Sequence, residues 1–367
     1  MLQPPINKTI TFLLPETGAR PAGGVKIALD YANALAKSGY DVYLVYPYIN
    51  MFRRCNLFLK VKQVFRPIKF FFRYSAKKWH PLERNVIEKL TITLEYKYAP
   101  KTQLYVATAC STALYLNDYP IAPERKIYFI QDYENWVMPD MQLRETYHFK
   151  MNKIVISNWL KDIVSGQEGE NCIVIPNGFN PSQYYITIPI KEKERYMVSM
   201  LYNDRPQKDM ETGLLALYRA HEIRPQIQAH LFGVSERPKD LPSWIIYHHN
   251  PSKEEHLLIN NKCAIYLGSS RNEGWGLTVG EAMMCGQAVV CTNNLGYLEM
   301  VNPGDNALVS RIGDFEDLAK KIIELIENDS LRYKIAQRGY ESISKFREED
   351  SARIFIQLMD LHVSVSV

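Results

Sequence analysis

The sequence has no long apolar run. None of its windows of eighteen residues is continuously apolar, which argues against a membrane-spanning helix of ordinary length. The apolar run at 10–14 is too short for the core of a signal peptide, and Glu16 follows it closely. We therefore expect a protein that stays in the cytoplasm.

Cysteines are few, and they show neither Cys-x-x-Cys spacing nor the spacing of mixed Cys/His zinc ligands. Several of them lie inside apolar runs, where cysteine behaves as a small hydrophobic residue. We predict that all six are reduced and structural and that they form no zinc site. They are Cys55, Cys110, Cys172, Cys263, Cys285 and Cys291.

The first predicted strand also lacks the glycine pattern of dinucleotide-binding enzymes. Gly18, Gly23 and Gly24 follow it, but their spacing is not Gly-x-Gly-x-x-Gly. A dinucleotide-dependent oxidoreductase needs that pattern between a strand and a helix. The spacing therefore disfavours this class of enzyme.

What the chain does have is the length and composition of a globular protein with two domains. It contains 367 residues, 46% of them hydrophobic and 23% charged. Its net charge of +4 is unevenly distributed, because residues 1–180 carry a net charge of +8 and residues 181–367 carry −4. The basic excess of the first half requires an explanation.

Much of this excess lies in the basic aromatic segment 52–80, which contains nine Lys or Arg and no Asp or Glu. Apolar residues recur in it at helical spacing, and Pro67 would kink or split a helix there. Three interpretations are open. The segment suits the anionic surface of a membrane, a nucleic-acid patch, or a packed helix whose lysines extend to solvent.

Both halves of the chain alternate strand and helix patterns. The run 9–14, the helical pattern 25–37 that ends at Gly39, and the run 42–46 form a strand–loop–helix–strand unit, the building block of a parallel sheet. Further predicted strands are 103–107, 126–130, 153–156, 196–201, 228–232, 244–247, 264–267 and 288–291. Helical patterns include 210–221 and 254–260, and successive helices are expected from 314 to about 361.

This alternation predicts an α/β protein with two Rossmann-like, doubly wound domains that face each other across a cleft. We place the N-terminal domain at 1–176 and the C-terminal domain at 177–345. A C-terminal helix at about 346–367 is expected to pack back on the first domain. The stretch 177–190 is the predicted linker.

One segment carries a pattern typical of phosphate binding. After the predicted strand 264–267 comes a polar loop, then Glu273-Gly274-Trp275-Gly276, and Leu277 and Thr278 open a helix. A glycine loop that runs into a helix N-terminus offers backbone N–H groups and a positive dipole end to a diphosphate. Glu281, within the same helix, is placed to accept hydrogen bonds from ribose hydroxyls. A helix cap with solvated glutamates is the alternative for any one of these residues alone.

The whole segment 270–290, Ser-x-x-Glu-Gly-x-Gly-x-x-x-x-Glu-Ala-Met-x-Cys-Gly-x-x-Val-Val, resembles the signature of retaining family-4 glycosyltransferases. Their hallmark is a pair of glutamates with seven residues between them, as in Glu273 and Glu281. Gly24 with its neighbour Gly23 resembles the family's N-terminal glycine pair, and Asn177 lies in a match to its Ile-Pro-Asn-Gly element. Residues 294–299 resemble its Gly-x-x-Glu donor loop.

The resemblance implies a GT-B fold and transfer of a sugar from a nucleotide-diphosphate donor with retention of configuration. It implies donor contacts by Glu281, Gly274, Gly276, Leu277, Thr278, Gly24 and Asn177. Glu273 would face the transferred sugar. No Asp-x-Asp follows an apolar strand, so we predict a metal-independent reaction without a cofactor.

The family places an Arg and a Lys on the diphosphate early in the C-terminal domain. Lys208 matches the lysine, whereas Asn203 occupies the usual arginine position and Arg205 is displaced by two residues. Guanidinium suits bidentate phosphate contact, so Arg205 remains a candidate. Asp132 follows a predicted N-terminal strand where the family often has a His or Asp near the sugar, and a loop Asp that caps a turn is an equal alternative.

We therefore predict a hexosyl- or deoxyhexosyltransferase that extends a lipid-linked glycan or oligosaccharide in surface polysaccharide synthesis, such as lipopolysaccharide or capsule. A lipid-linked acceptor favours the membrane interpretation of segment 52–80, and we expect no nucleic-acid partner. A retaining glycosidase is disfavoured, because it needs two carboxyl groups about 5 Å apart. A non-catalytic partner protein with the same fold is the remaining alternative.

Overall fold

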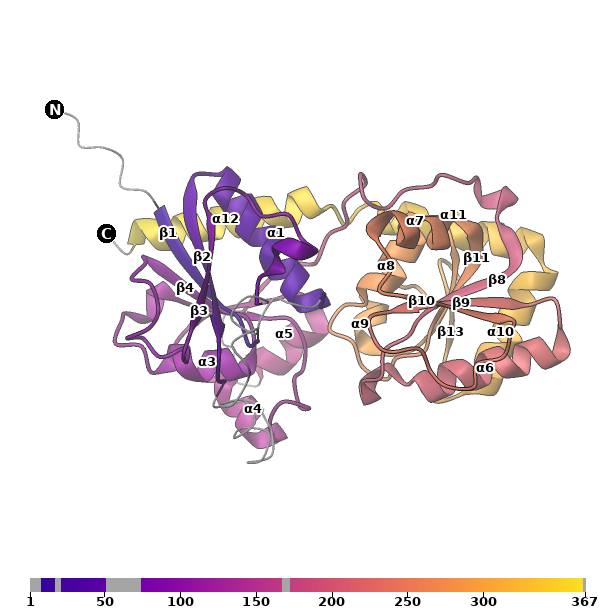
Figure 1. The fold of residues 1–367 in the computed structure, drawn as a ribbon, viewed down its shortest axis with the longest axis horizontal. Helices are drawn as coiled ribbons and strands as arrows, with labels where there is room; N and C mark the ends of the chain where they lie inside the picture. The colour runs from indigo at the N-terminus through magenta and orange to yellow at the C-terminus, as the bar shows by residue number, and fades with distance from the viewer. Residues whose placement is uncertain (1–7, 17–20, 51–73, 167–171, 366–367) are drawn as a thin grey trace. The chain divides into compact units, whose positions relative to one another are not determined.

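The computed structural model describes residues 8–16, 21–50, 74–166 and 172–365. Its contacts divide the chain into two compact units. The N-terminal unit comprises Met1–Pro176 and Asp350–Val367, and the C-terminal unit comprises Asn177–Glu349. Figure 1 shows the chain returning to the N-terminal unit through its last helix, drawn in yellow.

The N-terminal unit is built on a seven-stranded parallel sheet with the order β3-β2-β1-β4-β5-β6-β7. The strands are β1 (Lys8–Leu13), β2 (Tyr40–Pro47), β3 (Val86–Thr91), β4 (Leu104–Ala107), β5 (Lys126–Ile130), β6 (Asn152–Val155) and β7 (Cys172–Val174). The helices are α1 (Gly23–Lys37), α3 (Cys110–Asn117), α4 (Asp140–Tyr147), α5 (Asn158–Ser165) and α12 (Glu348–Val365), with 3-10 turns η2 (Ala76–Lys78) and η3 (Pro123–Arg125).

Apolar central strands place the core of this unit. Every residue of β4 and β5 is buried, as expected for strands of a parallel sheet that is covered on both faces. Helix α12 completes the unit through Phe355, whose ring stacks on Tyr31 at 4.2 Å between centroids. The Asp360 carboxylate of the same helix accepts hydrogen bonds from Lys8 Nζ at 2.7 Å and from the Tyr40 hydroxyl at 2.6 Å.

The C-terminal unit has a six-stranded parallel sheet with the order β10-β9-β8-β11-β12-β13. The strands are β8 (Glu194–Leu201), β9 (Gln228–Gly233), β10 (Ile245–His249), β11 (Cys263–Gly268), β12 (Ala288–Thr292) and β13 (Leu308–Ser310). The helices are α6 (Met210–Ile223), α7 (Lys253–Lys262), α8 (Leu277–Met284), α9 (Leu295–Leu298), α10 (Phe315–Glu327) and α11 (Asp329–Ile343), with 3-10 turns η4 (Ile190–Glu192) and η5 (Pro206–Lys208).

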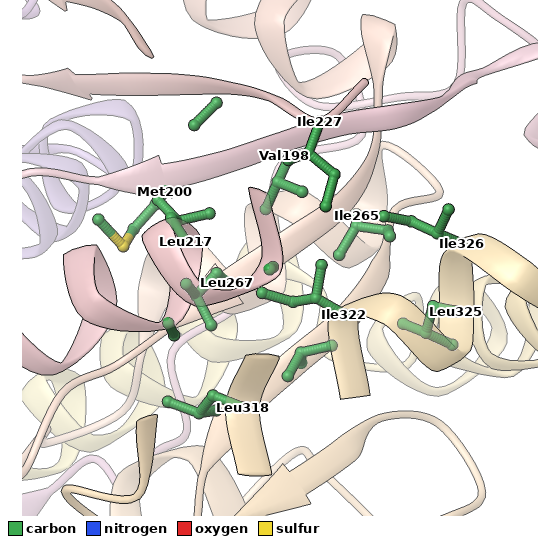
Figure 2. Close-up of a cluster of buried hydrophobic side chains, with 14 of the residues drawn as sticks. Val198, Met200, Leu217, Ile227, Ile265, Leu267, Leu318, Ile322, Leu325 and Ile326 are labelled. Carbon is green, nitrogen blue, oxygen red and sulfur yellow. The ribbon is translucent and has the colours of Figure 1, made fainter. Parts of the chain in front are cut away.

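An aliphatic cluster joins this sheet to its helices (Figure 2). Val198 and Ile265 from the central strands contact Leu217 of α6 and Ile322 of α10, and all four side chains are fully buried. Burying one such side chain stabilises the fold by roughly 1.5–3 kcal/mol. The cluster therefore makes a rigid base for the loops at the carboxyl ends of β8, β11 and β12.

The sequence predictions on cysteines and membrane segments have different outcomes. Cys110, Cys172, Cys263, Cys285 and Cys291 are buried and unbonded, as predicted, while Cys55 lies outside the described residues. Residues 51–73 of the basic aromatic segment also lie outside them. No helix in the described part of the chain is long and apolar enough to cross a membrane.

Candidate functional site

The candidate site lies where three neighbouring strands of the C-terminal unit end. Because β8, β11 and β12 are adjacent and parallel, the loops that follow them meet at one edge of the sheet. Hydrogen bonds join these loops to one another. Arg271 N donates to the Gln207 carbonyl at 2.8 Å, and Asn294 Nδ2 donates to the Ser270 carbonyl at 3.1 Å.

Lys208 and Glu273, which the sequence analysis predicted to serve one reaction, are ion-paired at this edge. Lys208 Nζ lies 2.6 Å from Glu273 Oε1, and their side chains are 18% and 10% exposed. Ser270 Oγ donates to the same oxygen at 2.7 Å. Within the described part of the chain, no hydrogen bond reaches Glu273 Oε2. One carboxylate oxygen is thus held by the protein, and the other is available to a ligand.

The glycine loop before α8 needs glycine at Gly276. Its φ of +100° is in the left-handed region, and a Cβ added there would lie 2.5 Å from the Tyr297 ring. Gly276 is also the N-cap residue of α8, so its position offers no capping side chain, and the first turn of α8 contains no acidic residue. Such a helix start suits an anion, because its first N–H groups and the helix dipole attract negative charge.

Thr278 and Glu281 lie on α8 as the sequence analysis expected. The Tyr266 hydroxyl donates to Thr278 Oγ1 at 2.8 Å, which leaves the Thr278 proton able to reach a ligand. Burial raises the pKa of Tyr266, and the charges of Glu273 and Glu281 raise it further, so both carboxylates lie near this hydroxyl. Glu281 is itself only 7% exposed.

Arg205 does not join this cluster. It is exposed, it precedes η5, and its side chain has no hydrogen bond or ion pair among the described residues. Arg271 is a second cation of these loops. It follows Ser270 directly, and its Nε is 2.9 Å from Asp209 Oδ2, next to Lys208 in the sequence. The sequence signal for Arg271 was its place in the polar loop between a buried strand and the glycine loop.

The predicted residues of the N-terminal unit form a separate group. Gly24 is exposed in the first turn of α1 and faces the Gln131 amide, and Asp132 Oδ1 accepts a hydrogen bond from Tyr133 N at 2.9 Å. Next along the chain, Glu134 Oε2 accepts from Cys110 N, at the start of α3, at 2.5 Å. Asn177 differs from these residues, because it is the first residue of the C-terminal unit. It is buried, and its Oδ1 has no hydrogen-bond partner among the described residues.

Residues in the loop after β12 support Glu273, and the sequence did not predict this role. The Tyr297 hydroxyl donates to Ser270 Oγ at 3.0 Å, and Asn294 Oδ1 accepts from Tyr297 N at 3.1 Å. Gly296 passes so close to Glu273 that a Cβ there would lie 2.1 Å from its carbonyl oxygen. A donor loop was expected at 294–299, but nothing in the sequence indicated that it would contact the loop after β11.

A family model matches the unit that holds this site, and curated relatives match parts of the chain. Residues 190–342 match the family model described as "Glycosyl transferases group 1". An uncharacterized glycosyltransferase of Methanocaldococcus jannaschii is 38% identical over 88 residues, which are 24% of this chain and 25% of that protein. The N,N'-diacetylbacillosaminyl-diphospho-undecaprenol alpha-1,3-N-acetylgalactosaminyltransferase of Campylobacter jejuni is 26% identical over 113 residues, 31% of this chain and 30% of that protein. The matched segments thus span about a quarter to a third of these relatives.

Solved structures match nearly the whole chain. Sucrose-phosphate synthase from Thermosynechococcus elongatus superposes with a TM-score of 0.72 at 17% identity, covering 98% of this chain and 100% of that one. The Anabaena protein HepE, solved in complex with UDP-glucose, has a TM-score of 0.72 at 18% identity and covers 97% of this chain and 99% of that one. These likenesses show the GT-B fold, two parallel-sheet α/β domains. The match to the glycosyl transferases group 1 model covers residues 190–342, which are less than half of the chain.

Proposed function

We propose that the protein is a retaining glycosyltransferase that transfers a hexose or deoxyhexose from a nucleotide-diphosphate sugar to a glycan acceptor. The observation that carries this proposal is the Lys208–Glu273 ion pair beside the uncapped start of α8. It combines a cation and a helix dipole for a diphosphate with a carboxylate oxygen for a sugar hydroxyl.

Each residue has a distinct task in this proposal. The backbone of Gly274, Gly276, Leu277 and Thr278 binds the donor diphosphate, and Lys208 neutralises the charge that develops as the glycosidic bond breaks. Glu273 Oε2 accepts a hydrogen bond from the transferred sugar, and Glu281 accepts from the ribose hydroxyls. Arg205 is assigned a phosphate contact only in the loaded enzyme. Gly24 and Asn177 are assigned donor contacts, and Asp132 is assigned a place near the transferred sugar.

Several relatives support a glycan acceptor. They include the lipopolysaccharide core biosynthesis glycosyltransferase LpsE of Rhizobium meliloti, the O-antigen chain mannosyltransferase B of Escherichia coli and the capsular polysaccharide biosynthesis glycosyltransferase CapM of Staphylococcus aureus. The Campylobacter relative is named for a diphospho-undecaprenol substrate. By analogy, we propose a lipid-linked acceptor and action at the inner face of a membrane.

The membrane part of the proposal rests on the sequence of segment 52–80. Replacing its nine Lys and Arg by Gln should release the protein from vesicles of anionic phospholipid, because headgroup attraction contributes about 1 kcal/mol per basic residue. Vesicles of neutral phospholipid are the control. Unchanged binding to anionic vesicles would remove the membrane from the proposal and leave the transferase intact.

Turnover tests the proposed activity. The purified chain is screened for thermal stabilisation by UDP-, GDP- and dTDP-sugars, and the best donor is then incubated with oligosaccharide and lipid-linked acceptors. We expect release of nucleoside diphosphate and a product that keeps the donor's anomeric configuration by NMR, unaffected by a metal chelator. Donor binding without hydrolysis or transfer would favour a non-catalytic GT-B protein instead.

A further inference from the structure

A chain of hydrogen bonds leads from the loop after β12 to the ion pair. The Tyr297 hydroxyl donates to Ser270 Oγ at 3.0 Å, Ser270 Oγ donates to Glu273 Oε1 at 2.7 Å, and Lys208 Nζ binds the same Oε1 at 2.6 Å. The Ser270 hydroxyl thus accepts one hydrogen bond, from Tyr297, and donates one, to Glu273. Because such chains polarise their members, the Tyr297 hydroxyl strengthens the bond that Ser270 makes to Glu273.

The Tyr297 side chain has a fixed position. Its exposed fraction is 1%, and its ring lies against both glycines that flank the polar loop. A Cβ at Gly268 would lie 3.1 Å from the ring, and a Cβ at Gly276 would lie 2.5 Å from it. The ring therefore sits beneath both ends of the 268–276 loop, with its hydroxyl aimed at the loop's centre.

The hydroxyl of Tyr297 stays protonated under ordinary conditions and can therefore donate a hydrogen bond. Burial raises its pKa well above the usual value of a tyrosine, and the negative charge of Glu273 raises it further. A neutral phenol in this place donates a hydrogen bond to Ser270 throughout the physiological pH range. Ser270 in turn has its proton directed to Glu273, so the carboxylate receives one hydrogen bond of constant direction.

We propose that Tyr297, acting through Ser270, is a positioning residue for the Lys208–Glu273 pair. The two hydroxyls fix Glu273 by its Oε1 and so present Oε2 to the donor sugar. This inference rests on the proposed function for its consequence in catalysis. The positioning itself is a property of the protein without ligand, so it is measured first in the absence of a donor.

The first test needs no donor. Acetic anhydride labels lysine amines in the full-length protein, and peptide mass spectrometry gives the rate at Lys208. Losing a hydrogen bond to Glu273 should loosen the pair and speed labelling of Lys208 about fivefold in Tyr297→Phe, which keeps the ring, and in Ser270→Ala. Tyr333→Phe is the matched control. Tyr333 lies on α11 of the same unit, and its hydroxyl donates to the Lys191 carbonyl of η4.

A double-mutant cycle separates positioning from general loosening. If Tyr297 acts through Ser270, the double variant Tyr297→Phe/Ser270→Ala labels no faster at Lys208 than Ser270→Ala alone. Melting temperatures of all variants show whether each is folded. An unchanged labelling rate in folded Tyr297→Phe, or effects of the two substitutions that add, would overturn the proposal.

The catalytic consequence is tested with UDP and UDP-glucose, or with the nucleoside diphosphate and sugar nucleotide of the best donor from the screen. Tyr297→Phe should lower kcat about fivefold and leave the Kd of the nucleoside diphosphate within twofold. If Tyr297→Phe has a normal kcat but altered Lys208 labelling, the positioning role of Tyr297 is limited to the protein without donor. If no sugar nucleotide binds the wild type, the proposed function fails, and the labelling result still decides the positioning.

Discussion

The two units have the same strand order around their first strands, but they differ at the start of one corresponding helix. In both sheets the first strand is central, and a crossover leads to the strand on its other side, β4 in the N-terminal unit and β11 in the C-terminal unit. Helix α3 follows β4, and helix α8 follows β11. At the start of α3 the protein supplies its own anion, because Glu134 accepts from Cys110 N. At the start of α8 the cap residue is Gly276, which supplies no side chain.

The loops that come from the next strand explain the difference. The loop after β5 carries Glu134 to the start of α3. The loop after β12 carries Tyr297 to Ser270 and leaves the start of α8 uncapped. One framework thus gives a helix start satisfied by the chain and another suited to a ligand, as expected where loops on a common scaffold determine function.

The largest expected effect distinguishes Glu273 of the C-terminal unit from Glu134 of the N-terminal unit. Glu273→Gln removes the charge that pairs with Lys208 and should lower the transfer rate about 10²–10³-fold, the usual effect of losing one electrostatic contact to the reacting groups. Glu134→Gln in the N-terminal unit should lower it less than fivefold. Initial rates of nucleoside diphosphate release at saturating donor measure both. Equal losses would contradict the assignment of donor chemistry to the C-terminal unit.

The next effect compares two glycines that each begin a helix. Gly276→Ala forces a side chain into left-handed backbone and toward the Tyr297 ring, so it should cost about 2–4 kcal/mol of stability and weaken nucleotide binding at least tenfold. Gly24→Ala meets only the Gln131 amide at 3.5 Å, an ordinary contact, and should change stability by less than about 0.5 kcal/mol. Denaturant unfolding and calorimetry check this pair, and a tolerated Gly276→Ala would contradict the described loop geometry.

Acid should act on the C-terminal unit through His230, which is buried, and His256, which is half-buried. Burial lowers the pKa of His256 to about 4, and burial together with the neighbouring His248 lowers the pKa of His230 to about 4. Because the unfolded chain binds these protons below about pH 6.5 and the folded chain does not, stability falls as pH drops from 6.5 toward 4. At pH 5 the loss is about 2 kcal/mol for His256. His256→Gln should reduce the stability difference between pH 7.5 and pH 5 by that amount in urea titrations, and an unchanged difference would show that His256 does not titrate in this way.

The smallest expected effect concerns the internal anion of the N-terminal unit. Glu134→Gln keeps a hydrogen-bond acceptor for Cys110 N but removes the charge at the start of α3, and it should cost about 0.5–1 kcal/mol of stability. Urea unfolding at low salt measures the loss, and high salt should reduce it because screening weakens charge–dipole attraction. A stabilising Glu134→Gln would mean that desolvation of the carboxylate exceeds its attraction to the helix.

The central strands were predictable from the sequence, whereas several edge strands were not. Strands β5 and β12 are fully buried, so their apolar runs are continuous and were predicted within one residue. The missed strands β3, β7 and β13 all lie at sheet edges. Two of them, β7 and β13, have only three residues, which is short for a strand pattern. Strand β3 is partly exposed and contains Glu88 and Lys89, so no clear alternation marks it.

The site was predictable where its residues are close in sequence. Glycines and glutamates of 273–281 lie in one loop and helix, so their spacing alone indicated their chemistry. The pairing of Lys208 with Glu273 depends on β8 and β11 being neighbours, which spacing does not reveal, and the same holds for Tyr297 on Ser270. The phosphate contact of Arg205 remains a prediction, because the structure does not bring this side chain to the Lys208–Glu273 pair.

Hydrogen exchange with and without donor tests the central claim most directly. The full-length protein is compared with and without the best sugar nucleotide, and exchange is followed by mass spectrometry of peptides. We predict strong protection of peptides that cover 268–281 and 294–299, and little change in those that cover 108–114, where Glu134 already satisfies the start of α3. Protection at 108–114 without protection at 268–281 would contradict the account, because the donor would then bind the N-terminal unit.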